Sequence, residues 1–492
     1  MKIKTYQPFL KKLAQKVRKK LKEDGLDIKV SFTDLIALAC QNDPYYCGTQ
    51  ADIRNGEWFA DVWRKYGRPN LHLRGFHYIL VSQGDVKRPW RNTLKPYENT
   101  EQDWNFLNLA SKSARYLGLV NPLEFDDQKN EVKIYSSLFP WQAIKNEIDE
   151  KIRKKVIDGV IIEPDLSLDL HFDLPSFKDL DYSELDEYIA SLQPYIVEIW
   201  IEKSTMNSVI EPICRKYGVN LVYGEGFISI TQVAKFLQRV KKAGKGGRIL
   251  YISDFDPAGD FMPKSIARQL EYWSREFGIK DVKLDHIALT YEQVLKYRLP
   301  TVPIKESDKR QANFSQRFSV DGAVELDALE ALYEGELSRL VEKELQDLFD
   351  TDYPEKLWQA IEKFNEDRKK HYERILEKYR EEMNEAMEYI EKVKEKYRQI
   401  EDLFDEYLQE ISPAIEKMKK IQENIQQDMK NMDHGFQPPE PAKKDRSKWL
   451  FDSNREYFSQ LKEYKKHEKR KDLDIILETA RQIAYEEAKK KN

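Results

Sequence analysis

Three short apolar runs in the middle of the sequence constrain the fold more than any other feature, because each of them stops at a polar cluster. The runs IVEIWI, NLVYG and RILYIS end at Glu202, at Gly224-Glu225-Gly226 and at Asp254-Phe255-Asp256. A helix-like stretch follows each run, so the pattern predicts β-α-β-α-β with carboxylates at the strand ends. Sites in open parallel sheets form just beyond the carboxyl ends of the strands. We therefore expect a site for a hard divalent cation and for phosphate chemistry at this edge.

The spacing of the two aspartates favours a cation. Asp254 and Asp256 are two residues apart at a strand end, so their side chains point to the same side. Two converging carboxylates repel and raise each other's pKa unless a cation neutralises them. Magnesium accepts one or two protein carboxylates and keeps its other positions for water and phosphate oxygens. Glu202, on the neighbouring strand end, is expected to complete the metal shell or to act as a general acid.

Each acid also has a purely structural interpretation. Asp256 followed by Pro257 is an ordinary helix N-cap followed by proline at the first helical position. Lys203 is placed to pair with Glu202. The occurrence of all three acids at consecutive strand ends, with a Gly-x-Gly turn between them, is what favours a functional site.

A glutamate after the first strand, a glycine-containing turn after the second and Asp-x-Asp after the third resemble the pattern of Toprim domains. The string DFDPAGD looks most like the A subunit of type IIB topoisomerases (topoisomerase VI) and its relative, the meiotic double-strand-break transesterase. The resemblance implies that Glu202, Asp254 and Asp256 bind Mg²⁺ and that the protein handles nucleic-acid phosphodiesters. GAVELDALEAL resembles a segment that follows Toprim in this group. Glu325 and Asp327 are therefore expected near the site, with a plain helix start as an equal alternative.

Four further residues adjoin these strand ends in the sequence. They are expected to surround the metal ligands without binding the cation themselves: Lys203, Gly224, Gly226 and Asp260.

The same resemblance makes Tyr78 the candidate nucleophile. In this group a winged-helix domain precedes Toprim and carries Arg-x-x-[Tyr/Phe]-Tyr, whose last tyrosine attacks DNA. LRGFHYIL supplies Arg74, His77 and Tyr78 at that spacing, with His77 where an aromatic ring is usual. Tyrosine has a pKa near 10 and needs activation, which Arg74 or the metal of a partner subunit would supply. The alternative is that Phe76 or Tyr78 packs into a helical core.

The length of 492 residues predicts two or three domains. The expected fold is an α/β Toprim domain with a parallel sheet, preceded by a winged-helix-like helical domain and followed by a long helical coiled coil. The winged helix is inferred from helix, loop, helix and the β-like stretch DDQKNEVKIYSS, interpreted as its wing. The predicted segments are a basic amphipathic helix (1–29), the winged-helix-like DNA-binding domain (30–140), an acidic connector (141–194), the Toprim domain (195–350), a coiled coil or helical hairpin (354–432), a linker (433–445) and a basic helical tail (446–492).

Residues 354–432 are rich in Lys and Glu and place apolar residues at helical spacing, which is typical of an imperfect coiled-coil seam. Ser412 and Pro413 are a favourable N-cap and first-position pair, so a new helix is expected there. A helical hairpin within the chain and an extended dimerising arm are both open.

Composition narrows the possible partners. The first 22 residues carry nine Lys or Arg and no acid, and their apolar residues lie four apart, which favours a packed surface helix. The alternative is a helix that contacts the backbone phosphates of double-stranded DNA with little sequence specificity. The three cysteines form no CxxC pair, and no apolar stretch approaches about 18 residues. We expect a soluble cytoplasmic protein without membrane contact, associated with the nucleoid in a bacterium or archaeon. The resemblance implies a homodimer. Because GxxxxGK[ST] is absent, any ATP-driven reaction would need a separate ATPase subunit.

Three functions remain open at this point. The leading hypothesis is a Mg²⁺-dependent DNA strand-cleaving enzyme in which Tyr78 attacks a phosphodiester and stays attached to one DNA end. The alternative is a Toprim nuclease that uses activated water, as defence and mobile-element proteins do. A non-catalytic DNA-binding coiled-coil protein is the third.

Overall fold

The computed structural model describes residues 6–126, 130–136, 193–304, 310–319, 322–397, 404–430 and 439–490, apart from residues 92, 225 and 469. The acidic connector predicted at 141–194 lies outside these residues except for its last two. The chain has two compact units. One contains Met1–Leu138, Gln193–Phe349 and Lys443–Asn492, and the other contains Asp350–Ala442.

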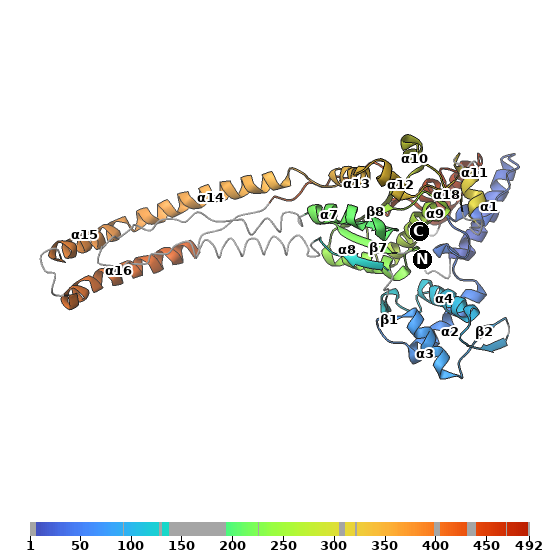
Figure 1. Ribbon diagram of the computed structural model, residues 1–492, viewed down its shortest axis with the longest axis horizontal. Helices are drawn as coiled ribbons and strands as arrows, with labels where there is room; N and C mark the ends of the chain where they lie inside the picture. Colours follow the sequence, from blue (N-terminus) through green and yellow to red (C-terminus); the bar gives the residue numbers. More distant parts are fainter. Residues whose placement is uncertain are drawn as a thin grey trace. The chain divides into compact units, whose positions relative to one another are not determined.

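The core of the first unit is a sheet in which six strands of the described chain take the order β10-β9-β8-β6-β7-β5. Figure 1 labels β7 and β8 of this sheet. Its four inner strands are parallel. They are β6 (Tyr195–Ile201), β7 (Asn220–Gly224), β8 (Gly246–Ile252) and β9 (Val282–Ala288). Every residue of β6 is buried, as expected for a parallel strand covered on both faces.

Helices connect the parallel strands, and the local sequence fixes where they begin. α7 (Asn207–Tyr217) follows β6, α8 (Ile230–Ala243) follows β7, and α9 (Pro257–Glu276) follows β8. The side chains of Ser229 and Asp256 cap α8 and α9 by accepting backbone N–H groups. α8 packs against α9, and α7 packs against α13. The order of strands and helices expected from the three apolar runs is therefore present.

Shorter elements complete the sheet-containing part of this unit. They are α10 (Tyr291–Tyr297), α11 (Gln311–Arg317), α12 (Leu326–Leu332), α13 (Glu336–Gln346) and α17 (Tyr457–Tyr464). α13 also packs against β9, which buries its apolar face.

A mainly helical subdomain precedes the sheet. Its helices are α2 (Gln50–Tyr66), α3 (Leu73–Gln83) and α4 (Glu101–Tyr116), and they enclose a core rich in aromatic rings. Thr100 caps α4 by accepting the Asp103 N–H, as the sequence predicts. The core rings therefore hold α3 by one face only, because Phe76 and His77 are buried while Tyr78 is exposed.

The predicted wing is placed differently from what the sequence suggested. Of the stretch DDQKNEVKIYSS, β5 (Asn130–Lys133) pairs antiparallel with β7 and thus forms an edge of the central sheet. The helical subdomain instead contains a hairpin of β2 (Lys87–Trp90) and β3 (Thr93–Pro96), between α3 and α4. A β-like run carries no information about its pairing partner, which explains the wrong assignment. Two short strands, β1 (Leu71–His72) and β4 (Phe125–Asp126), also pair in parallel.

The two ends of the chain pack together. α1 (Tyr6–Glu23) buries its apolar stripe, including Leu13 and Val17, and contacts α18 (Leu473–Lys489). β10 (Phe451–Asp452) pairs antiparallel with β9 and adds an edge strand to the sheet. The segment predicted as a separate tail is thus part of the first unit, because its apolar face covers α1 and the sheet.

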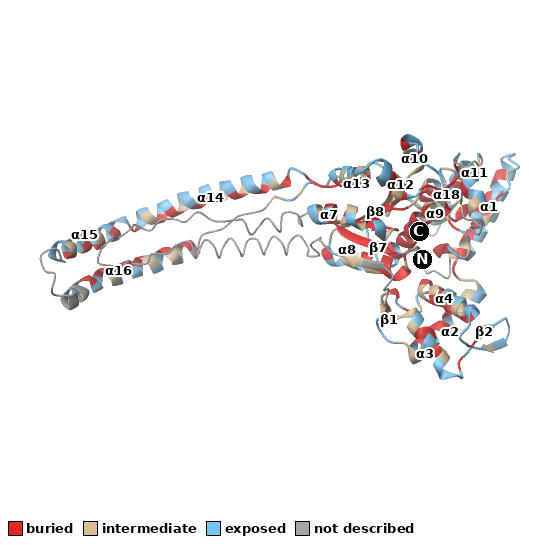
Figure 2. Cartoon of the chain, viewed as in Figure 1, coloured by how far each residue is buried: buried red, intermediate tan, exposed pale blue. Residues whose placement is uncertain are grey.

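The second unit contains a helical hairpin. α14 (Tyr353–Lys378) and α15 (Arg380–Tyr397) pack against α16 (Phe404–Lys430). Each helix carries a line of buried residues, with exposed residues around it (Figure 2). Lys378 of α14 pairs with Asp428 of α16 at 2.6 Å, and Lys396 of α15 pairs with Glu410 of α16 at 2.9 Å, so α16 runs antiparallel to α14 and α15. Of the two outcomes left open by the sequence, the hairpin is the one seen.

The helix start predicted at Ser412 is wrong. α16 continues through this position, and Pro413 lies inside it. The buried residues Ile411 and Ala414 flank the proline, so packing of the apolar face offsets the hydrogen bond that proline removes. Among the described residues, none of the helices is both long and apolar enough to span a membrane.

Candidate active site at the carboxyl edge of the sheet

Glu202 is the first of the predicted acids and lies where β6 ends. Its backbone N–H donates to Ile252 O of β8 at 3.1 Å, which places it beside the segment that carries Asp254. The Glu202 Oε2 atom is buried and has no hydrogen-bond partner among the described residues. Burial, followed by the charges of Asp254 and Asp256, raises the pKa of Glu202 to about 7. Near neutral pH, Glu202 is therefore present in both its protonated and its ionised form.

Asp254 is held from two sides. Its Oδ1 accepts the backbone N–H of Leu326 at 2.7 Å, and its Oδ2 lies 3.3 Å from Lys203 Nζ. Burial raises the pKa of Asp254, although these two partners act in the opposite direction. The carboxylate is therefore fixed in position before any ligand binds.

Asp256 is the N-cap of α9, the structural role that the sequence also allowed. Its Oδ1 accepts the Gly259 N–H at 2.6 Å. Its other oxygen makes no hydrogen bond to any described residue. A capping carboxylate can still bind a ligand through its second oxygen, so the cap does not exclude a functional role.

Lys203 joins the acids of two segments. Its ammonium lies 2.6 Å from Asp327, 3.2 Å from Glu325 and 3.3 Å from Asp254. Burial would lower the pKa of Lys203, but the hydrogen bond to Asp327 and the charge of Asp254 raise it. The prediction that Glu325 and Asp327 lie near the strand ends is met, whereas the suggested pairing of Lys203 with Glu202 is not seen. An ion pair between side chains more than 120 residues apart leaves no local signal in the sequence.

The glycine turn follows the neighbouring strand. Gly224 ends β7 and is buried, and Tyr223 just before it is in register with Ile201 of β6. Gly226 has a φ of 79°, a left-handed conformation that favours glycine. Residue 225 is outside the described part of the chain.

Asp260 is near the strand ends but is committed elsewhere. It pairs with Lys264 at 3.2 Å and with Arg317. Burial alone would raise its pKa, but these two cations outweigh burial, so the pKa of Asp260 is lowered. Its role is to hold α11 against α9.

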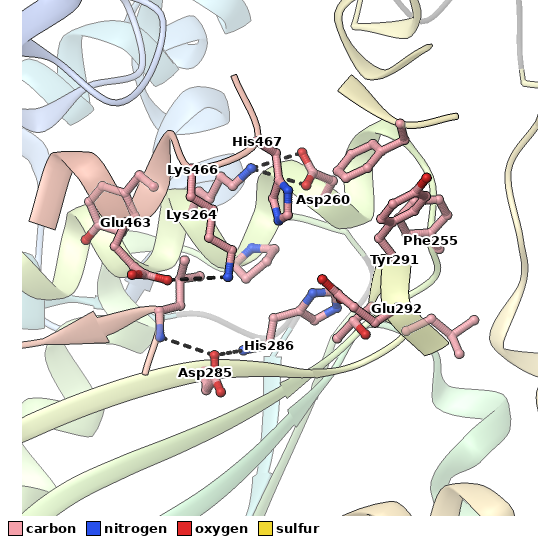
Figure 3. Close-up of a pocket in the computed structure, with 16 residues that line it drawn as sticks. Phe255, Asp260, Lys264, Asp285, His286, Tyr291, Glu292, Glu463, Lys466 and His467 are labelled. Carbon is pink, nitrogen blue, oxygen red and sulfur yellow. Dashed lines mark hydrogen bonds and ion pairs between the residues drawn. The ribbon is translucent and has the colours of Figure 1, made fainter. Parts of the chain in front are cut away.

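Beside Asp260 a cavity of about 110 Å³ lies on the β9 side of this edge (Figure 3). Its charges are mostly matched, since Lys264 reaches Asp260 and Lys466 reaches Glu463. His286 is held by Ser253, with 3.0 Å between Nε2 and Oγ, and burial lowers its pKa to about 4. Sequence reasoning found only Asp260 of this cavity, because histidines and lysines on β9, α9 and the C-terminal segment form no motif.

The acids meet part of what Mg²⁺ requires. Carboxylate oxygens are the ligands that this ion prefers. Glu202 Oε2 could serve as one, because it has no hydrogen-bond partner among the described residues. Among the described residues, however, there is no group of three His, Cys, Asp or Glu side chains close enough to form a ready-made metal site. An ion bound here would have to take Asp254 Oδ2 from Lys203. The donor chemistry of these acids therefore fits Mg²⁺.

The residues of the tyrosine motif lie on α3. The elements that α3 mainly packs against carry none of the acids at the strand ends. α3 packs against α2, α4 and β1, all within the helical subdomain. Tyr78 is 54% exposed, and Arg74, one turn earlier on the same face, lies over the ring of Trp104 at 4.0 Å. His77 points inward and hydrogen-bonds Tyr97 Oη at 2.7 Å. The alternative that an aromatic ring of this motif packs into the helical core is therefore met by Phe76 but not by Tyr78.

The chain was compared with known proteins. No model of a known protein family matches the sequence, and no curated protein matches it.

Proposed function

We propose that this protein is a Mg²⁺-dependent DNA strand-cleaving enzyme of the Toprim type, similar to the topoisomerase VI A subunit. The observation that carries the proposal is the register of β6 and β8, which brings the buried, unpartnered Glu202 Oε2 beside Asp254. Burial of a carboxylate oxygen that has no hydrogen-bond partner costs free energy, which a bound ligand would offset. Phosphodiester chemistry at a hard cation is the use that fits oxygen donors on a strand edge.

Glu202, Asp256 and one oxygen of Asp254 would hold the ion. When bound, Mg²⁺ would polarise the scissile phosphate and offset the charge that develops on it. Lys203 would offset part of the negative charge of Glu325 and Asp327, which reduces their repulsion of the incoming DNA. Asp254 is fixed by the Leu326 N–H, which reduces the reorganisation needed on binding.

In the transesterase form of the proposal, Tyr78 Oη attacks the phosphorus and a tyrosyl phosphodiester forms. The bond between phosphorus and the deoxyribose oxygen breaks, and that oxygen takes up a proton. Arg74 is on the same exposed face and would orient the phosphate. Because the main contacts of α3 are with α2, α4 and β1 of its own subdomain, the tyrosine of one copy would act with the acids of a second copy, so a homodimer is part of the proposal. No nucleotide enters this reaction, and an ATP-driven version would need a separate ATPase subunit.

A nuclease that uses activated water is the second candidate. The pKa of about 7 for Glu202 favours it, because a carboxyl group with that pKa can accept or donate a proton at neutral pH. In this form Tyr78 binds DNA without forming a bond to it.

Supercoiled plasmid incubated with the protein and MgCl₂ and then denatured with detergent tests both forms. A protein–DNA adduct that Tyr78→Phe removes supports the transesterase. Cleavage that survives in Tyr78→Phe, without an adduct, supports the nuclease. Tyr485→Phe is the matched control, because Tyr485 is similarly exposed on α18. DNA that stays intact with both metal and wild-type protein present would refute the enzymatic proposal.

A mixing experiment tests the dimer. Tyr78→Phe protein and Asp254→Asn protein are each inactive alone in the transesterase form. Mixed, they regain part of the activity if tyrosine and acids come from different copies. Activity that stays absent in the mixture, with both variants folded and able to exchange partners, would contradict the arrangement between two copies.

A further inference from the structure

Phe227 is an exposed aromatic side chain close to the candidate site. It lies in the loop between β7 and α8 and is 47% exposed, and it is the one phenylalanine of the described chain that is classed as exposed. Its ring centroid is 6.0 Å from that of Phe261, with the planes at 68°. The guanidinium of Arg310 lies over both rings, at 5.5 Å from Phe227 and 5.9 Å from Phe261.

The topology places this cluster at the same edge of the sheet as the acids. Phe227 comes three residues after the end of β7, and Phe261 is one turn past Asp256 on α9. In the sheet β6 lies between β7 and β8. The contact between Phe227 and Phe261 thus joins the segments that follow the two neighbours of β6, on either side of the strand that ends at Glu202.

The exposure of Phe227 is not explained by packing. Phe255, only a few residues before Phe261 in the chain, is 3% exposed and contacts three other aromatic rings. Among the described residues Phe227 has one ring partner, and it leaves about half of its surface in solvent. Its edge-to-face contact with Phe261 and the cation above it hold the ring in a fixed orientation, which lowers the cost of using it as a binding surface.

We propose that Phe227 is a stacking platform for an unpaired nucleobase of the DNA strand next to the phosphate that is cleaved. The inference rests on the proposed function, and it adds that the substrate must be single-stranded or locally unpaired at this position. Every base has a face that can stack on an aromatic ring, so the platform tolerates any sequence. Arg310 supplies a positive charge for the phosphate next to that base. A double-stranded segment could not offer a base face to Phe227.

The test measures stacking without cleavage. An oligonucleotide with 2-aminopurine at an unpaired position in a short gap is titrated with protein in EDTA, and fluorescence quenching reports the stacked base. Phe227→Leu keeps an apolar side chain but removes the ring, and it is expected to weaken binding about tenfold and to abolish the quenching. Phe227→Trp keeps an aromatic face and should bind as the wild type does. Tyr485→Leu is the control for loss of an exposed ring elsewhere, and thermal melting confirms that each variant is folded.

The outcomes separate the platform from the proposed function. Wild-type quenching that Phe227→Leu loses, and Phe227→Trp keeps, supports the platform even if plasmid cleavage is never seen. Equal quenching by wild type and Phe227→Leu overturns it, whether or not the protein cleaves DNA. Preference for the fully paired duplex over the gapped DNA also overturns it. Cleavage itself is scored separately on plasmid with MgCl₂.

Discussion

The carboxyl edge of the central sheet and the exposed face of α3 hold the two parts of the proposed chemistry under opposite conditions. At the sheet edge, the partly buried acids Glu202 and Asp254 lie at adjacent strand ends beside Lys203, and the pKa of Glu202 is raised to about 7. On α3, Tyr78 is open to solvent with Arg74 one turn away. The sheet edge is formed by pairing of strands that are distant in the sequence, and it brings like charges together. The exposed face of α3, by contrast, is formed within one turn of helix. The comparison teaches that, of these two regions, the sheet edge is the one with a buried carboxylate oxygen that lacks a hydrogen-bond partner among the described residues.

Removing an acid should have the largest effect. Asp254→Asn keeps the hydrogen bond from Leu326 but loses the charge, so Mg²⁺-dependent cleavage should fall on the order of 10³-fold. Plasmid cleavage and Mn²⁺ titration measure it. Asp347→Asn, which changes an exposed acid of the same unit, should have no effect. Full activity in Asp254→Asn would mean that the sheet edge is not the catalytic region.

Replacing the proposed nucleophile Tyr78 should affect the chemistry of α3 and leave the sheet edge unchanged. Tyr78→Phe should abolish the covalent adduct completely while leaving Mn²⁺ affinity unchanged, because Tyr78 has no contact with the acids in the described chain. Gel analysis of denatured reactions and the metal titration together give the result. A fall in metal affinity in Tyr78→Phe would show that the two regions are not independent.

Lys203 sharpens the description of the sheet edge. The ammonium competes with a divalent cation for Asp254, so Lys203→Met should raise Mn²⁺ affinity about three- to tenfold. It should also lower the melting temperature in EDTA, since Glu325 and Asp327 lose their partner. Calorimetric titration checks the first effect. Weaker metal binding would instead assign Lys203 to positioning Asp254.

Substitution of Glu202 should have the smallest effect, a change in melting temperature that depends on pH. Its pKa in the folded state, about 7, is above the ordinary value of 4.5, so the native state binds this proton more tightly than the unfolded chain does. The stability due to the proton is complete below 4.5 and is lost as the pH rises through about 7. Glu202→Gln retains a neutral group, so in EDTA its melting temperature should exceed that of the wild type by a few degrees at pH 8. The difference should be smallest near pH 4.5, and a difference that does not vary with pH would contradict the raised pKa.

The sequence predicted local events well and partnerships poorly. The ends of β6, β7 and β8 and the caps at Asp256 and Thr100 follow from residue spacing and capping chemistry. The pairing of β5 with β7 could not be predicted, because strand registers depend on neighbours far away in the chain. For the same reason the ion pairs of Lys203 had no sequence signal. The exposure of Phe227 depends on which surfaces other segments cover.

The C-terminal segment made another such connection. Arg446 pairs with Asp285 of β9 at 2.8 Å and with Glu344 of α13 at 2.5 Å, and Asp445 pairs with Lys283 at 2.5 Å. The chain leaves the first unit after Phe349 and re-enters it at Lys443. Both junctions lie beside the same hydrophobic core, because Phe349 and Trp449 are buried in it together. Both ends of the segment between these junctions are therefore held by the first unit. Helices α14, α15 and α16 can therefore be lengthened or shortened while these ion pairs still hold the returning chain to β9 and α13.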